Sequence, residues 1–179
     1  MKDRHKLLLE LLEGCGAGLH ALLTRLTLRE DVAEELMQEL FIKLSKARGL
    51  EKVSNLPAYA RRAAINMAFD WHRRRQNMTV ALDSVGEAAS GQRSPLAKMI
   101  EAERLEEVLA GVGKLNASIR EVFVLRHIQQ LDYDEIARQT GKTTHQARAL
   151  CHKALKRLRN LLDIDSRSSD KEASYAPNR

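Results

Sequence analysis

The chain has 179 residues, of which 44% are hydrophobic and 30% charged, and this composition fits one ordinary globular domain or two small ones. The net charge of +6 favours a polyanionic partner. We expect no membrane span, and Glu10 and Glu13 interrupt the N-terminal leucines, which argues against a signal peptide. Cys15 and Cys151 lack CxxC spacing, so the sequence indicates a reducing cytoplasm and ordinary thiols instead of a disulfide framework.

Helical periodicity runs through nearly the whole chain and no strand alternation is visible, so the expected fold class is all-α. The first apolar stripes, residues 7–12 and 19–26, are separated by a Gly-Cys-Gly-Ala-Gly stretch at residues 14–18. We expect the helix to break or loosen at this stretch, because glycine disfavours a helix interior. A strongly amphipathic helix should follow over about residues 31–47.

The helix expected over residues 31–47 has an acidic, amide-bearing face. Glu35, Gln38 and Glu39 are three and four residues apart, so they share one side of a helix. In a basic protein, such a face would repel phosphates and attract a basic protein surface. The alternative is a plain solvated face, and the residues alone leave both interpretations open.

The next helix, from about Pro57 to Arg75, is rich in arginine. Arginines beside exposed aromatic rings suit single-stranded nucleic acid, because bases stack on the rings while guanidinium groups hold phosphates. We assign Phe69 to the core and leave Tyr59 and Trp71 open between stacking and packing. The cations and aromatic residues of this helix are Tyr59, Arg61, Arg62, Phe69, Trp71, Arg73, Arg74 and Arg75.

The periodicity then fails over a stretch rich in Asn, Ser, Gly and Gln, which is typical of a linker. Beyond it, Pro95 should start a helix that runs to about Gly113, and Asn116 should cap the helix after that. The last residues form a polar tail that we expect to be disordered. The expected division is a domain of residues 1–76, a linker of 77–94, a domain of 95–163 and a tail of 164–179.

The second domain ends in a pattern typical of a helix-turn-helix. A short helix opens at Asp132, Gly141 suits the bend that ends it, and Thr143 with Gln146 fits a capping box at the start of a longer helix that runs to about Leu162. A basic helix that follows such a turn fits the major groove of DNA. The alternative is a packed helix pair with a solvated basic face. The cations of the longer helix are Arg148, Lys153, Lys156, Arg157 and Arg159.

In combination, these blocks resemble the extracytoplasmic-function sigma factors of bacterial RNA polymerase. Residues 31–44 are similar to the region-two helix that, in this family, grips the clamp helices of the largest polymerase subunit. Residues 58–75 are similar to the family's segment for promoter melting and minus-ten recognition. Residues 120–158 resemble region four, which reads the minus-thirty-five element and docks on the flap of the second-largest subunit. A linker in place of a middle region is typical of this group.

The resemblance implies three sets of site residues. The polymerase-binding set is Asp31, Glu35, Gln38 and Glu39. The minus-ten and melting set is Tyr59, Arg61, Arg62, Asn66, Trp71, Arg73 and Arg74. The minus-thirty-five set is Thr144, His145, Gln146, Arg148, His152, Lys153, Lys156 and Arg157.

Some residues depart from the family pattern. Ile65 replaces a frequent Arg, and Lys142 follows Gly141 where an apolar residue is usual. Ala149 and Leu150 replace a common Ser-Arg pair, which leaves fewer polar side chains to read bases.

The resemblance further implies core RNA polymerase and promoter DNA as partners, and an anti-sigma factor wedged between or around the two domains. We expect no cofactor and no membrane insertion. The expected function is therefore promoter-specific transcription initiation in the bacterial cytoplasm by a protein that is not an enzyme.

The alternative function is a helix-turn-helix regulator with an N-terminal helical domain for ligand binding or dimerisation. Such a regulator would need neither the acidic face nor the arginine-rich helix. An enzyme is disfavoured, because His145, Cys151 and His152 match no strong zinc signature and no orienting base for a nucleophile is evident. We expect no metal site.

Overall fold

The computed structural model describes residues 4–79 and 95–173, with side chains for residues 4–76 and 104–162. The regular structure of these residues is helical throughout, which agrees with the expected all-α class. An N-terminal unit is formed by α1 (Arg4–Thr27), α2 (Glu30–Lys46), a 3-10 turn (Leu50–Lys52) and α3 (Leu56–Thr79). A C-terminal unit is formed by α4 (Pro95–Gly113), α5 (Ala117–Phe123), a π-helical turn (Val124–Ile128), α6 (Tyr133–Thr140) and α7 (Thr144–Ala173).

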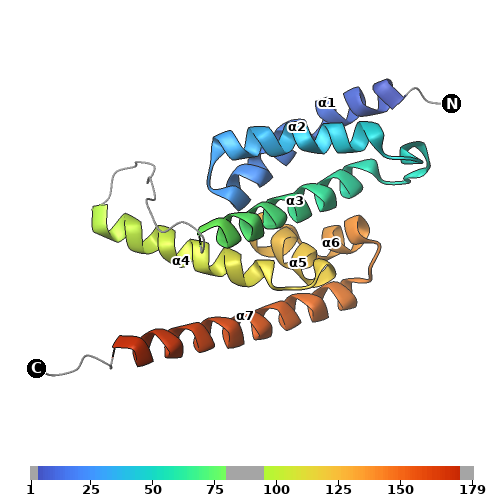
Figure 1. Ribbon diagram of the computed structural model, residues 1–179. Helices are drawn as coiled ribbons and strands as arrows, with labels where there is room; N and C mark the ends of the chain where they lie inside the picture. Colours follow the sequence, from blue (N-terminus) through green and yellow to red (C-terminus); the bar gives the residue numbers. More distant parts are fainter. Residues whose placement is uncertain (1–3, 80–94, 174–179) are drawn as a thin grey trace, which may run out of the picture.

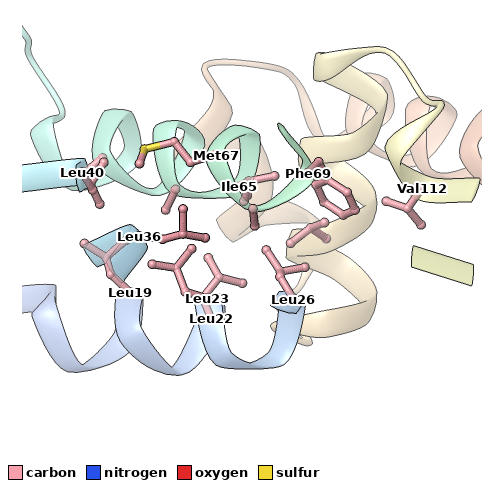
Figure 2. Close-up of a cluster of buried hydrophobic side chains, with 14 of the residues drawn as sticks. Leu19, Leu22, Leu23, Leu26, Leu36, Leu40, Ile65, Met67, Phe69 and Val112 are labelled. Atoms are coloured by element: carbon pink, nitrogen blue, oxygen red, sulfur yellow. The ribbon is translucent and has the colours of Figure 1, made fainter. Parts of the chain in front are cut away.

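The helix α1 is continuous through the glycine-rich stretch at residues 14–18, so the expected break is wrong. Glycine in a helix interior costs about 1 kcal/mol relative to alanine. The cost is outweighed here because Leu11, Leu19 and Leu26 bury one unbroken stripe against α2 and α3. Figure 2 shows the C-terminal part of this stripe pointing toward α3.

The same helix bears on the expectation of no membrane span. Among the described residues, α1 is the one helix long and apolar enough, by length and composition alone, to cross a membrane. In the folded chain its buried side chains contact those of α2 and α3, as seen for Leu22 and Leu23 near Leu36 (Figure 2). Packing in the protein core therefore accounts for the buried apolar side of α1, while Leu9 and Leu12 of the same helix are exposed.

The two following helices form as the sequence predicts. Val32, Leu36, Leu40 and Leu44 are buried on one side of α2, and the acidic residues occupy the other side. Pro57 lies in the first turn of α3, where its missing N–H is not needed. Ala60, Ala64, Ile65 and Ala68 form the inner face of α3, and Phe69 is buried as expected.

The C-terminal unit begins with two helices that meet at a capped turn. The Asn116 Oδ1 accepts a hydrogen bond from the Ile119 backbone N–H at 3.0 Å, so the expected cap is confirmed. The helix α5 then widens into the π-helical turn Val124–Ile128, where the Gln129 N–H donates to the Val124 carbonyl. Such turns are rare and are frequently found at functional sites.

The helix-turn-helix is formed by α6 and α7, and its expected capping geometry is confirmed. Gly141 has φ of +67°, a left-handed conformation that glycine adopts at little cost. The Gln146 N–H donates to Thr143 Oγ1 at 3.1 Å, and the Thr143 N–H donates to Gln146 Oε1 at 3.0 Å. This reciprocal pair is a capping box, so α7 starts where the sequence predicts.

The ends of the expected domains differ from the structure. The helix α7 continues to Ala173, so the expected disorder is wrong for residues 164–173, while residues 174–179 lie outside the described part. No Gly or Pro interrupts this stretch, and extending an existing helix costs far less than starting one. Residues 77–79 belong to α3, and the rest of the expected linker, 80–94, lies outside the described residues.

The two units pack against each other through α3, which lies along α4 and α5 (Figure 1). Buried residues of both units form one hydrophobic cluster, in which Phe69 of α3 lies near Val112 of α4 (Figure 2). A smaller second cluster, with Val122, Ile136 and Cys151, lies under the helix-turn-helix. Because the larger cluster contains residues of both units, the two units are held together by a shared hydrophobic core.

Candidate functional site

The acidic face of α2 is exposed, which fits both a polymerase-binding face and a plain solvated face. Glu35, Gln38 and Glu39 are all solvent-exposed, opposite the buried leucines. Asp31 lies in the first turn of α2, where Arg29 donates to its two carboxylate oxygens at 3.1 and 2.5 Å. These hydrogen bonds lower the pKa of Asp31. The face therefore presents charge to solvent at Glu35 and Glu39, whereas Asp31 is paired within the chain.

An open pocket of about 480 Å³ connects this face to the arginine-rich helix. Glu39 of α2 lines it together with Arg73 and Arg74 of α3. The expected polymerase-binding and minus-ten sets therefore adjoin on the surface of the N-terminal unit. Sequence reasoning treated them as separate sets, because the contact between α2 and α3 is tertiary. The remaining lining residues are Ile42, Lys43, Met67 and Asp70.

Apart from Arg62, the exposed residues of the minus-ten set lie at the two ends of α3. Tyr59 is 44% exposed, so its ring is available for stacking. Arg74 is exposed, and Arg73 is exposed while it pairs with Asp70 at 2.9 Å. Trp71 is half-buried, with the guanidinium of Arg75 lying 5.6 Å from its ring centroid. The open question about Trp71 is thus answered mainly in favour of packing.

The middle of α3 faces the C-terminal unit. The Arg62 Nε donates to Glu121 Oε1 of α5 at 2.9 Å, and the Arg61 guanidinium donates to the Gln139 amide oxygen of α6. Asn66 is half-buried on the side of α3 that it shares with Arg62. The structure therefore divides the expected minus-ten set into a group at the ends of α3 and a group at the interface between the units, in which the Arg62 side chain stays 49% exposed.

Apart from Thr144, the residues of the expected minus-thirty-five set are exposed on α7. The buried side of this helix carries Ala147, Cys151, Ala154 and Leu158. Thr144 is half-buried and donates to Asp134 Oδ1 at 2.7 Å, so it fixes the turn and is less available to DNA. The exposed members are His145, Gln146, Arg148, His152, Lys153, Lys156 and Arg157.

Sequence reasoning missed Tyr133, which supports this surface. Two guanidinium groups lie close to its ring, that of Arg126 at 4.9 Å and that of Arg148 at 5.5 Å from the ring centroid. Arg126 also donates to the Leu131 carbonyl at 2.9 Å. The sequence did offer a signal for this role. Tyr133 is an aromatic residue at the start of a helix-turn-helix that is rich in arginine.

Glu121 and Gln139 were also missed, although Glu121 gave a signal. It is the one acidic residue of α5, and its side chain is only 7% exposed. Because a buried carboxylate needs a partner, the sequence could have indicated a cation contact at this position.

The histidine nearest to the buried thiol of Cys151 in this structure is His127, which is distant in the sequence. The Cys151 Sγ lies 3.3 Å from His127 Nε2, while His145 and His152 are exposed elsewhere on α7. Burial lowers the pKa of His127, and the charge of Arg126 lowers it further. Among the described residues, no group of three or more His, Cys, Asp or Glu side chains is placed to hold a metal ion.

Comparison with known proteins matches both helical units. The family model for "Sigma-70 region 2" matches residues 11–78, and that for "Sigma-70, region 4" matches residues 105–158. The RNA polymerase sigma-E factor of Streptomyces coelicolor is 33% identical over 119 residues, which cover 64% of each chain. The sigma-E factor of Streptomyces antibioticus is 27% identical over 148 residues, covering 78% of this chain and 77% of that protein.

Among solved structures, the chain is similar to one described as the sigma factor RpoE in complex with the anti-sigma factor NepR from Bartonella quintana. The TM-score is 0.45 and the sequence identity 22%, over 92% of this chain and 99% of that chain.

The two family matches together cover more than half of the chain, in the order region 2 and then region 4. The first match contains α2 and α3 almost entirely, and the second contains α5, α6 and the part of α7 up to Leu158. The chain therefore belongs to the sigma-70 family, with the two-region organisation of its extracytoplasmic-function group.

Proposed function

We propose that the chain binds core RNA polymerase and directs promoter-specific transcription initiation through a minus-ten and a minus-thirty-five element. The observation that carries this proposal is the pairing, in one chain, of an exposed acidic face on α2 with an exposed basic helix α7 behind a capped turn. The two surfaces lie within the matches to region 2 and region 4, respectively. A plain helix-turn-helix regulator would have no use for the acidic face.

Polymerase binding is assigned to Glu35, Gln38 and Glu39. These side chains are exposed, share one side of α2 and make no part of the core. An acidic and amide-bearing face fits a basic protein surface through charge complementarity. Asp31 contributes less, because Arg29 already neutralises its carboxylate.

Recognition of the minus-thirty-five element is assigned to α7. Its first turns carry His145, Gln146 and Arg148, and the first turns of a recognition helix reach base edges in the major groove. Lys153, Lys156 and Arg157 lie further along, where cations meet phosphates.

Minus-ten recognition and melting are assigned to α3. Tyr59 offers an exposed ring to an unstacked base, while Arg73 and Arg74 offer charge to the strand. Asn66 can both donate and accept hydrogen bonds, which suits the edge of a base turned out of the stack. This recruitment and melting involve no covalent chemistry, and they take place in the cytoplasm together with the polymerase. An anti-sigma factor is a further partner that the family resemblance implies.

The test is in vitro transcription with purified core polymerase over a library of randomised promoters. The full chain should enrich promoters that share two spaced elements, and core polymerase alone should enrich none. The Gln38→Ala, Glu39→Ala double variant should bind core polymerase more weakly with an unchanged melting temperature, since exposed substitutions cost little stability. A matched control is Glu13→Ala, an exposed acid on α1 outside the α2 face. Absence of any enrichment would refute the proposed function.

A further inference from the structure

The open pocket between α2 and α3 combines cations with apolar surface. Lys43 of α2 and Arg73 and Arg74 of α3 supply positive charge. Ile42, which is 53% exposed, and Met67, which is 8% exposed, supply the apolar surface. The pocket volume of about 480 Å³ lies in the range of pockets that hold small organic ligands. Size and composition therefore both suit a ligand site.

The directions of the two helices fix the order of the residues along the pocket. A short connection, residues 47–55, joins α2 to α3, so the two helices run antiparallel and side by side (Figure 1). Lys43, near the end of α2, therefore lies toward the earlier part of α3 and Met67. Glu39 lies one turn before Lys43 and hence nearer to Arg74. The pocket thus has an apolar end with a lysine, a carboxylate in the middle and arginines at the other end.

Three of the charged groups in the pocket are available to a ligand. Within the described part of the chain, the exposed side chains of Glu39, Lys43 and Arg74 form no hydrogen bond and no ion pair. Arg73 pairs with Asp70 at 2.9 Å, which orients its guanidinium. Three cations against two acids leave the pocket positive. Such a pocket suits a ligand that carries anionic groups together with hydroxyl donors for the free carboxylate.

We propose that this pocket is a binding site for a free guanine ribonucleotide. Its phosphates bind Arg73 and Arg74, because guanidinium groups hold phosphate oxygens with a planar set of donors. Its ribose hydroxyls donate to the Glu39 carboxylate, a contact that acidic side chains make with the ribose 2′-hydroxyl in dinucleotide-binding folds. The order of phosphate, ribose and base along a nucleotide matches the order of arginines, carboxylate and apolar residues along the pocket.

The base belongs at the apolar end of the pocket. Its flat face packs on Ile42 and Met67, since a thioether is soft and contacts aromatic rings favourably. Lys43 carries only donors, and guanine presents two neighbouring acceptors, N7 and O6. Adenine has an amino group in place of O6, and this donor would face the ammonium group. The pocket therefore favours guanine over adenine.

The surroundings of the pocket favour a free nucleotide over a nucleotide of a promoter strand. Glu35 is exposed one turn before Glu39, so a strand that continues across α2 would bring its next phosphates against carboxylates. DNA also lacks the 2′-hydroxyl that Glu39 would accept from. A single ribonucleotide supplies this hydroxyl and brings no further phosphates to the acidic face.

A bound nucleotide would also cover residues with proposed roles in transcription. Glu39 belongs to the face proposed to bind core polymerase, and Arg73 and Arg74 belong to the set proposed to hold the promoter strand. The nucleotide and the polymerase therefore compete for Glu39. This competition rests on the proposed function, whereas nucleotide binding by the chain alone does not.

Isothermal titration calorimetry with the full chain, without polymerase or DNA, tests the site. The titrants are GDP, its 2′-deoxy analogue, ADP and inorganic pyrophosphate. Arg74→Ala removes a phosphate contact, and its matched control is Arg48→Ala, an exposed arginine outside the pocket. Glu39→Ala removes the ribose contact, and its matched control is Glu34→Ala, an exposed acid of α2 outside the pocket.

We expect GDP to bind the wild type about fivefold more tightly than either deoxy-GDP or ADP, the scale of one hydrogen bond. Arg74→Ala should weaken GDP binding about tenfold, the scale of a hydrogen bond to a charged group, and Arg48→Ala should leave it unchanged. Glu39→Ala should bind GDP and deoxy-GDP alike, because the 2′-hydroxyl has lost its acceptor, while Glu34→Ala should keep the preference for GDP.

Two outcomes would overturn the site. One is the absence of GDP binding to the chain. The other is equal binding of GDP and pyrophosphate, which would show a basic patch that attracts any phosphate. Both leave the proposed function standing, because promoter enrichment and polymerase binding without GDP test that function separately.

Competition is measured by the fluorescence anisotropy of the labelled chain with core polymerase. Added GDP should weaken polymerase binding by the wild type, and its effect should be about tenfold less potent in Arg74→Ala. Polymerase binding that GDP leaves unchanged, at concentrations that saturate the chain, would overturn the competition.

Discussion

The Tyr133 ring holds guanidinium groups on two elements, Arg126 of the π-helical turn and Arg148 of α7. Each such contact contributes about 0.5–1 kcal/mol at an exposed site. A guanidinium that reads base edges gains specificity when its orientation is fixed before DNA arrives, because less side-chain freedom is lost on binding. Tyr133 is therefore a positioning residue for Arg148.

Replacing Tyr133 with Leu should weaken the preference for the minus-thirty-five sequence by about 0.5–1 kcal/mol, whereas Tyr133→Phe should retain it because the ring remains. Competition between specific and mutated promoter duplexes for the polymerase complex measures this preference. In a double-mutant cycle, Tyr133→Leu should have little further effect once Arg148 is Ala. Additive effects of the two changes would show that the ring does not act through Arg148.

His72 connects α3 to α1, since its Nε2 lies 2.7 Å from the Leu26 carbonyl oxygen. Burial lowers the pKa of His72, and the charge of Arg75 lowers it further, while the Leu26 hydrogen bond and Glu106 partly oppose both. As the pH falls, the unfolded chain binds a proton at the ordinary pKa of about 6.5 before the folded chain does. Burial of neutral His72 therefore contributes its full stability at pH values above the unfolded pKa. This contribution is lost as the pH falls toward the lower pKa of the folded chain.

Urea unfolding should therefore show a loss of stability between about pH 7.5 and 5.5 that is smaller in His72→Gln than in the wild type. Gln keeps an N–H donor for the Leu26 carbonyl and does not titrate. The control is His152→Gln on the exposed side of α7, which should retain the wild-type loss. An equal loss in wild type and His72→Gln would contradict the assignment to His72.

At the scale of elements, α1 shows what local sequence can and cannot predict. The caps at Asn116 and Thr143 were predicted because each depends on residues within three positions. The continuity of α1 depends on α2 and α3, which cover its leucines, so the glycines at residues 14–18 gave the wrong local signal.

The glycines of α1 make a sharp stability prediction. A Cβ added at Gly14 or Gly18 would meet no heavy atom within 4 Å, so each change to Ala should stabilise the protein by about 0.5–1 kcal/mol. A Cβ at Gly16 would lie 2.9 Å from Leu12 Cδ1 and would displace that side chain. The free energy of unfolding measured with urea should therefore be lower for Gly16→Ala than for Gly14→Ala and Gly18→Ala. Equal gains at all three positions would rule out the packing argument.

The basic helix α7 should separate base reading from phosphate binding. Replacing Arg148 with Ala should relax the preference at one base pair by about 1–3 kcal/mol if it makes a bidentate contact. Replacing Lys156 with Ala should weaken binding to all sequences alike and reduce the salt slope by about one. Both are measured with the polymerase complex on a duplex library at several salt concentrations. Identical sequence profiles for the two variants would refute this division.

At the scale of the whole molecule, the two units share a core that contains Phe69, Val112 and Leu158. The sequence predicted the units, their order and the helices within them, because each has its own periodic pattern and caps. The interface was not predictable. Arg62 and Glu121 are 59 positions apart, and the residues around each of them do not indicate that the two side chains form an ion pair.

The shared core predicts one cooperative unfolding transition. Trp71 is the single tryptophan, so its fluorescence follows the N-terminal unit, while circular dichroism follows the helices of both. The two urea transitions should coincide in the wild type. Phe69→Ala should destabilise the protein by about 3–5 kcal/mol and separate the transitions, because the ring joins the units.

A core change away from the interface provides the control for this experiment. Leu23→Ala removes a fully buried side chain of α1, and it should shift both transitions together. Separated transitions in the wild type would show that the two units unfold independently.

The long sequence distance across the interface has a consequence for synthesis on the ribosome. Arg62 is made 59 residues before Glu121, and Arg61 is made 78 residues before Gln139. At about 5–20 residues per second, these arginines precede their partners by roughly 3–16 seconds. Small helical units fold within milliseconds. The nascent chain therefore carries a folded α1–α3 unit with a bare arginine surface for several seconds, and the C-terminal unit closes over it as the last step.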